Sequence, residues 1–166
     1  KLTGVADAVY NPLRPELVMT AKEKNITATG GLYMLVAQAV FAAEKFIDTK
    51  IADSEIDRVY NEIYNGKQNI VLVGMPGCGK TTVGAALAEK LGQPLVDIDV
   101  LVEQAAGCTI PEVFAAQGEE AFRALEHQAL AQVVRQGGQV IATGGGIVTR
   151  PENHDLLLRS ATVVYL

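Results

Sequence analysis

The stretch from residue 74 to residue 82 constrains the fold of this 166-residue chain more than any other. It reads Gly-Met-Pro-Gly-Cys-Gly-Lys-Thr-Thr and fits the pattern G-x-x-x-x-G-K-[ST]. An apolar run precedes it, and an amphipathic helical pattern follows it. Such a turn directs several backbone N–H groups at the phosphates of a nucleotide, at the positive end of a helix. The alternative, a turn that binds nothing, does not require Lys80 and Thr81.

This segment, here called the phosphate loop, predicts a role for each of its polar residues. Lys80 is expected to lie over the β- and γ-phosphates of ATP and to act in catalysis, and the Thr81 hydroxyl is expected to ligate Mg²⁺. The other nucleotide-binding residues predicted from the loop are Gly74, Gly77, Cys78, Gly79 and Thr82.

Composition narrows the possible partners. The hydrophobic content of 49% is sufficient for a packed core, and the net charge of −5 argues against nucleic acid or an anionic membrane surface as a partner. We therefore expect small-molecule substrates. No segment reads as a signal peptide or a membrane span, which favours a cytoplasmic protein. Cys78 lies inside the phosphate loop, which favours a reducing compartment, and two His residues with two Cys make structural zinc improbable.

Strand and helix patterns alternate from residue 68 onward. This alternation predicts an α/β fold, with a P-loop NTPase-type parallel sheet flanked by helices, similar to nucleoside-monophosphate kinases. The final apolar run, residues 161–166, reads as a strand. A core strand of a parallel sheet is normally followed by a covering helix, so we expect a truncated domain and a fragment of a longer protein.

Two acidic residues follow the strand pattern that begins at Leu95. Asp97 and Asp99 are two positions apart, which would direct both carboxylates to the same side of an extended strand end, where α/β sheets bind ligands. One of them is then a candidate for the Mg²⁺ water shell and the other for a substrate hydroxyl. The alternative is that one of them caps a helix beginning near Val100.

Further on, Arg123 lies at the start of a helix that follows Gly118, near the expected ligand edge of the sheet. Its planar guanidinium suits a carboxylate or a phosphate, although a solvated surface arginine is the alternative. Gly144, Gly145 and Gly146, here called the glycine triplet, follow the third strand pattern. They indicate that a ligand or another backbone approaches closely and meets N–H groups; a flexible linker is the rival interpretation.

Together these motifs, over residues 68–166, resemble shikimate kinase. The resemblance implies phosphorylation of the 3-hydroxyl of shikimate with ATP and Mg²⁺. It assigns Asp97 to the metal, Asp99 to the acceptor hydroxyls as the candidate base, Arg123 to the shikimate carboxylate, and Gly145 and Gly146 to the substrate through backbone N–H groups. The family's lid arginine and a later carboxylate-binding arginine would fall beyond Leu166, so we expect the isolated chain to bind nucleotide weakly and to turn over poorly.

Two alternatives to this function stay open from the residues alone. One is another small-molecule P-loop kinase, acting on gluconate or a nucleoside monophosphate. The other is a module that binds nucleotide without catalysis.

The first 66 residues show a different pattern. We expect a strand over residues 5–10, a short helix opened by Pro15, a long helix over residues 32–47, and a helix capped by Ser54 that stops at residues 65–66. This is too little for an independent domain.

Residues 1–50 resemble the C-terminal end of shikimate dehydrogenase. The resemblance is carried by residues 6–13 and by residues 30–38. It assigns Tyr10 and Gln38 to shikimate, and Ala8 and Gly31 to the NADP nicotinamide. The family's catalytic pair and dinucleotide loop would lie upstream, so no dehydrogenase activity is expected. With residues 51–67 as a helical linker, the order of the two resemblances predicts part of a bifunctional enzyme; oligomeric state is not readable.

Overall fold

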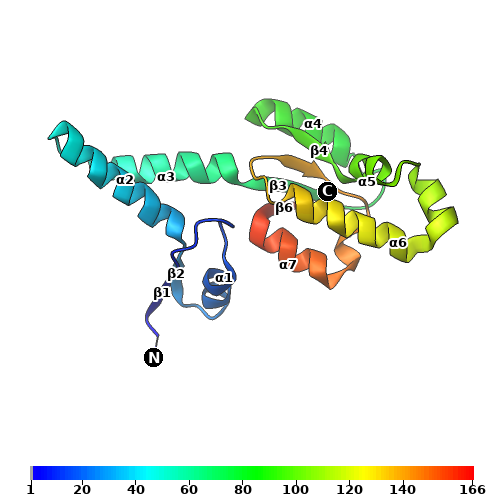
Figure 1. Cartoon of the computed structure of the whole chain (residues 1–166), viewed down its shortest axis with the longest axis horizontal. Coiled ribbons are helices and arrows are strands. Elements are labelled where there is room, and N and C mark those ends of the chain that lie inside the picture. Colours follow the sequence, from blue (N-terminus) through cyan, green and yellow to red (C-terminus); the bar gives the residue numbers. More distant parts are fainter. Residues whose placement is uncertain (1) are drawn as a thin grey trace. The chain divides into compact units, whose positions relative to one another are not determined.

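The computed structural model describes residues 2–166, which form two compact units, one ending at Lys67 and the other spanning Gln68–Leu166 (Figure 1). The first contains β1 (Gly4–Ala6), α1 (Glu16–Glu23), β2 (Thr27–Thr29), α2 (Gly31–Ile47) and α3 (Asp53–Lys67). The second contains β3 (Asn69–Val73), α4 (Lys80–Leu91), β4 (Leu95–Asp97), α5 (Ile98–Ala106), α6 (Ile110–Val133), β5 (Val140–Ala142), the 3₁₀ turn η1 (Ile147–Thr149), α7 (Pro151–Ser160) and β6 (Ala161–Tyr165). Within the described residues, no helix is long and apolar enough to cross a membrane.

The first unit differs from the prediction at three points. The first strand ends at Ala6 instead of residue 10, and a second short strand, β2, pairs with it in parallel. Helix α3 begins at Asp53, so Ser54 lies in its first turn and is not its N-cap. It also passes through Gly66 to Lys67, because one glycine in a final helical turn costs only about 1 kcal/mol. Leu32, Val36 and Ile56 form the small core between α2 and α3.

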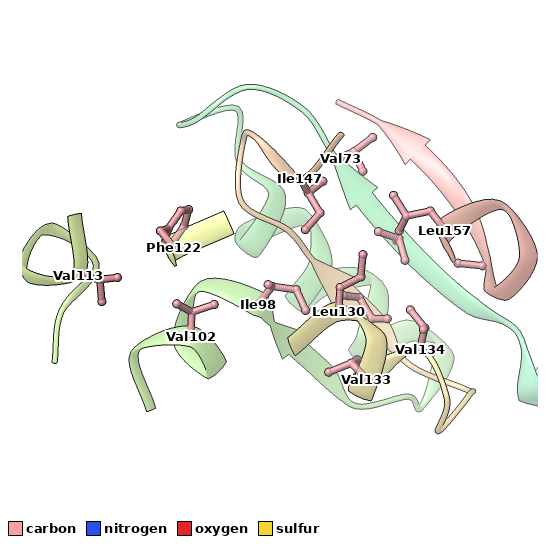
Figure 2. Close-up of a cluster of buried hydrophobic side chains, with 13 residues drawn as sticks. Val73, Ile98, Val102, Val113, Phe122, Leu130, Val133, Val134, Ile147 and Leu157 are labelled. Carbon is pink, nitrogen blue, oxygen red and sulfur yellow. The ribbon is translucent and has the colours of Figure 1, made fainter. Parts of the chain in front are cut away.

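The second unit is a parallel four-stranded sheet with the strand order β4-β5-β3-β6. Successive side chains of a strand point to opposite faces, and β3 follows this rule. Leu72 packs with Ala88 of α4 on one face, whereas Val71 and Val73 belong to the cluster formed with α5, α6 and α7 on the other. Figure 2 shows that cluster, in which Leu130 and Ile98 lie between the sheet and its helices. The predicted parallel α/β fold is confirmed.

Gly118 separates two helical segments inside α6, as the sequence predicts. Its φ of 80° and ψ of 176° are not helical. The first segment begins with a capping box in which Thr109 and Glu112 are paired: the Thr109 N–H donates to the Glu112 carboxylate at 2.8 Å. The second segment, which carries Arg123, therefore starts afresh at Gly118 and takes its own direction.

Asn69, the first residue of β3, connects this strand to the end of α6, to the end of α7 and to the residue before β5. Its side-chain amide donates to the carbonyls of Val134, at 3.0 Å, and Ser160, at 3.3 Å, and its oxygen accepts from the Gln139 N–H at 3.1 Å. Asn69 is only 1% exposed, so these backbone groups cannot turn to water if the amide is removed.

We therefore expect Asn69→Ala to lower the free energy of unfolding by about 3 kcal/mol, because it leaves buried carbonyl and N–H groups without partners. Urea denaturation followed by circular dichroism measures this. The control is Gln104→Ala on the exposed side of α5, which should change stability by less than about 0.5 kcal/mol. Equal effects of the two variants would contradict the assignment.

Candidate functional site

The phosphate loop connects the end of β3 to the start of α4, at the carboxyl edge of the sheet. Gly77 and Gly79 have φ angles of 78° and 88°, a left-handed conformation that side chains with a Cβ rarely adopt. Gly79 is also the N-cap residue of α4, so the loop delivers its backbone N–H groups to the positive end of that helix. This geometry suits an anionic ligand.

Lys80 is buried within the loop, at 8% exposure. Its ammonium donates to the carbonyls of Gly74 at 3.0 Å and Met75 at 2.8 Å. A buried cation needs polar partners, and the two loop carbonyls provide them. They hold the positive charge of Lys80 in a fixed position beside the backbone N–H groups of the loop.

Thr81 and Asp97 meet across the loop. The Thr81 hydroxyl donates to Asp97 Oδ2 at 2.9 Å, and Asp97 Oδ1 accepts from the Asp99 N–H at 3.0 Å. A hydroxyl beside a carboxylate is an oxygen donor set that fits Mg²⁺. Among residues 2–166, no group of three His, Cys, Asp or Glu side chains could hold a metal alone. A Mg²⁺ ion bound here would therefore complete its shell with waters and phosphate oxygens.

The prediction that Asp97 and Asp99 both project from an extended strand end is wrong. The strand β4 ends at Asp97, which caps α5, and Asp99 lies in the first helical turn. The capping alternative holds for Asp97, which bonds the Asp99 N–H and Thr81 with its two oxygens. The two carboxylates stay neighbours because a helix turns sharply at its cap.

Asp99 is the carboxylate that faces the interior of the site. Its Oδ1 is buried and has no hydrogen-bond partner. Burial raises the pKa of the Asp99 carboxyl above its usual range, the Asp97 carboxylate raises it further, and the charge of Lys80 opposes the rise. A carboxylate with a raised pKa and a free oxygen is suited to accept a proton or a hydrogen bond from a hydroxyl group.

Arg123 lies one helical turn before a buried carboxylate that the sequence analysis did not assign. Its Nη1 donates to Glu126 at 2.9 Å and its Nη2 donates to Glu119 at 3.3 Å. Burial acts to lower the pKa of Arg123, but the two carboxylates outweigh it and raise that pKa. Glu126 is fully buried, and burial raises the pKa of its carboxyl although Arg123 opposes the shift. The spacing of three residues on a helix is the signal that could have identified Glu126.

The glycine triplet borders all of these groups. A Cβ atom on Gly144 would lie 2.5 Å from Glu126 Oε1 and 2.7 Å from Asp99 Oδ1. On Gly146 it would lie 2.3 Å from both terminal nitrogens of Arg123. Side chains therefore fill the space beside Gly144 and Gly146, where the sequence analysis predicts a ligand or another backbone. Beside Gly145 the Pro76 backbone nitrogen would lie 3.1 Å from such a Cβ atom, which agrees with the predicted approach of another backbone.

Asp99, Arg123 and Glu126 are here called the acceptor-side cluster. Gly145 links this cluster to the phosphate loop. A Cβ atom on Gly145 would lie 2.6 Å from the Pro76 ring. Pro76 had no role in the sequence analysis, and nothing local in the sequence could reveal a contact across 69 positions. The structure thus brings together the loop, Asp97, Asp99, Arg123 and the triplet, as predicted.

The residues that resemble a dehydrogenase lie in the first unit. The Gly31 N–H donates to the Val9 carbonyl at 2.9 Å, and a Cβ atom on Gly31 would lie 2.1 Å from the Ala8 carbonyl oxygen. Glycine is thus required by close backbone packing. Tyr10 and Gln38 are exposed. Their binding roles stay predictions.

The raised pKa of Asp99 predicts a pH-dependent stability effect. A carboxyl whose folded-state pKa is above its unfolded value of about 3.9 stabilises the fold below that value, and this contribution is lost as pH rises through the folded-state pKa. Asp99→Asn should therefore raise stability at pH 7, by about 1 kcal/mol, and much less at pH 4. Urea denaturation at both pH values measures it, with Glu152→Gln, an exposed carboxylate, as the control. Equal gains at both pH values would refute the prediction.

The contact between Gly146 and Arg123 predicts a steric effect. Gly146→Ala forces the guanidinium to move away from the buried Glu126 carboxylate, to which it donates at 2.9 Å, and the loss of that bond should lower the free energy of unfolding by about 1–3 kcal/mol. Gly66→Ala is the matched control, because a Cβ there meets nothing within 4 Å. Chemical denaturation of both variants decides: a Gly146→Ala protein as stable as the parent would show that the space is not needed.

Comparison with known proteins gives independent evidence on the family to which this chain belongs. A family model described as shikimate kinase matches residues 76–166. The shikimate kinase of Symbiobacterium thermophilum is 54% identical over 98 residues, which cover 59% of this chain and 56% of that protein. That of Synechococcus sp. strain CC9605 is 50% identical over 99 residues, covering 60% of this chain and 49% of that protein. The chain spans about half the length of the curated relatives it matches.

Solved structures agree with this result. The shikimate kinase of Acinetobacter baumannii in complex with shikimate has a TM-score of 0.60 and 42% identity, covering 63% of this chain and 59% of that one. The Aquifex aeolicus enzyme has a TM-score of 0.58 and 34% identity, covering 60% of this chain and 59% of that one. With the phosphate loop, the acidic pair, Arg123 and the glycine triplet gathered at one edge of the sheet, the chain belongs to the shikimate kinase family.

Proposed function

We propose that the protein transfers the γ-phosphoryl group of ATP to the 3-hydroxyl of shikimate, with Mg²⁺. The observation that carries this proposal is the contact between Gly145 and Pro76, which joins the phosphate loop to the acceptor-side cluster. A phosphoryl donor and its acceptor must lie in line within a few ångströms, and adjoining loops meet that requirement. The relative from Acinetobacter baumannii that binds shikimate supports the choice of acceptor.

Each side chain has one task in this reaction. The loop N–H groups and Lys80 neutralise charge on the phosphoryl group, while Thr81 and Asp97 hold the metal and its water. A Mg²⁺ ion held there would supply charge neutralisation to the phosphoryl group. Asp99 accepts a hydrogen bond from the acceptor hydroxyl and takes its proton as the new bond forms. Because its pKa is raised, it can hold that proton more readily than an exposed carboxylate can.

On the acceptor side, Arg123 is assigned to the shikimate carboxylate, and Gly145 and Gly146 are assigned to the substrate through their N–H groups. The buried Glu126 holds Arg123 at 2.9 Å, so the guanidinium is oriented before the substrate arrives. A polyhydroxylated carboxylic acid fits this combination of an acid for hydroxyls and an arginine for a carboxylate. A nucleoside monophosphate would offer Arg123 a phosphate instead of a carboxylate, so the choice of acceptor rests on the shikimate-binding relative from Acinetobacter baumannii.

We also infer that residues 1–50 derive from the C-terminal end of a shikimate dehydrogenase, whose complete form uses NADP, so that the parent protein joins two successive reactions on one chain. The close approach of Gly31 to Ala8 brings together the two residues that the resemblance assigns to the nicotinamide.

The enzyme hypothesis predicts that Asp99→Asn separates binding from transfer. In the full-length protein, ATP affinity should stay within about twofold, while ADP release in the presence of shikimate should fall about 10²–10⁴-fold, the usual contribution of a proton acceptor. Lys80→Ala is the matched variant, in which ATP affinity itself should fall. Calorimetry and coupled ADP release measure the two quantities.

A substrate panel distinguishes the alternatives. ADP release with gluconate or a nucleoside monophosphate, and none with shikimate, would overturn the choice of acceptor. ATP binding with no release for any acceptor in the full-length protein would favour a non-catalytic nucleotide-binding module.

A further inference from the structure

Asn153 is a buried polar residue, in the first turn of α7, that the proposed reaction does not use. It has no exposed surface. Its side-chain Nδ2 donates to the Ile147 carbonyl at 2.7 Å, and its Oδ1 lies 2.6 Å from His127 Nδ1. Its backbone N–H donates to the Arg150 carbonyl at 3.1 Å. A buried amide is costly unless both of its ends are paired, and here both are.

The direction of each hydrogen bond is fixed by its partners. The Ile147 carbonyl can only accept, so the NH₂ group of Asn153 faces it. The amide oxygen then faces His127 and can only accept, so His127 Nδ1 carries the hydrogen. The result is a directed chain from His127 through Asn153 to the backbone of Ile147.

This chain joins two parts of the acceptor side. His127 lies on α6 directly after Glu126 and one turn after Arg123. Ile147 directly follows the glycine triplet and is itself buried. Asn153 therefore links the helix that presents the guanidinium to the loop that presents the N–H groups of Gly145 and Gly146.

Two outer contacts connect the same elements. Arg150 donates to Glu120, and His154 Nε2 lies 2.5 Å from the Val148 carbonyl oxygen. Both include exposed groups, which water can replace at little cost. Asn153 itself is closed to water, and its bond to the Ile147 carbonyl is buried, so the inner link is the one that can fix distances.

We propose that Asn153 is a positioning residue of the acceptor site, with His127 as its hydrogen-bond donor. It fixes the glycine triplet against Arg123, so that the guanidinium and the Gly145 and Gly146 N–H groups converge on one carboxylate-bearing acceptor. The assignment rests on the proposed function for the nature of that acceptor. Ile147 and Leu157, one turn later on α7, belong to the apolar core cluster, where a residue that only filled space would be apolar.

The test uses one variant that removes both hydrogen bonds of the Asn153 side chain and two variants that each remove one of them. Asn153→Ala removes both links, Asn153→Asp can accept from His127 but cannot donate to Ile147, and His127→Ala removes only the donor. Glu152→Gln, on the exposed side of the same helix, is the control. We expect Asn153→Ala and Asn153→Asp to weaken shikimate binding about tenfold and His127→Ala to weaken it less, with ATP affinity within about twofold in all.

A second readout reports geometry without substrate. In ¹⁵N-labelled free protein, the amide signals of Gly144, Gly145 and Gly146 should shift in both Asn153 variants and stay in place in Glu152→Gln. Lower melting temperatures with unmoved glycine signals and unchanged shikimate affinity would overturn the proposal and leave Asn153 as a core residue. If the unsubstituted protein does not bind shikimate, the proposed function fails. The glycine signals then still decide whether Asn153 positions the glycine triplet.

Discussion

The parallel pairing of β3 with β5 is the constraint on which the site depends. Ile70, Val71 and Leu72 are in register with Val140, Ile141 and Ala142, so the two strands end at the same level. The phosphate loop follows one strand and the glycine triplet follows the other. Because parallel strands deliver their carboxyl ends to one edge, two loops about 70 positions apart in the sequence become neighbours, and Pro76 packs on Gly145. Backbone pairing thus brings the phosphate loop and the glycine triplet together.

The acceptor side retains charges that the fold does not fully satisfy. Asp99 Oδ1 and Glu126 Oε1 are both buried without a partner, and both border Gly144. A fold selected only for stability would replace or pair these carboxylates, since an unpartnered buried charge costs several kilocalories per mole. Glu126 recovers part of that cost by bonding Arg123. Asp99 recovers little, which is the expected condition of a group whose free oxygen serves a ligand.

The sequence predicted features that depend on adjacent residues better than contacts between residues far apart in the chain. The loop, the break at Gly118 and the alternation of strands and helices each depend on a few adjacent residues, and the structure has them as expected. The segment around Asp97 carries both a strand pattern and a helix cap, and the cap ends the strand two residues early. Pro76 at Gly145 and Asn153 at Ile147 are tertiary contacts, so no local pattern could indicate them.

The two glycine-rich segments use glycine for different physical reasons. In the phosphate loop, Gly77 and Gly79 have positive φ angles, so the conformation itself excludes other residues. The glycine triplet has no φ in the left-handed range, and its backbone is one that any residue can adopt. What excludes side chains there is space, which Asp99, Glu126, Pro76 and Arg123 already occupy. The triplet is therefore a surface against which these four side chains pack, and its sequence follows from their positions.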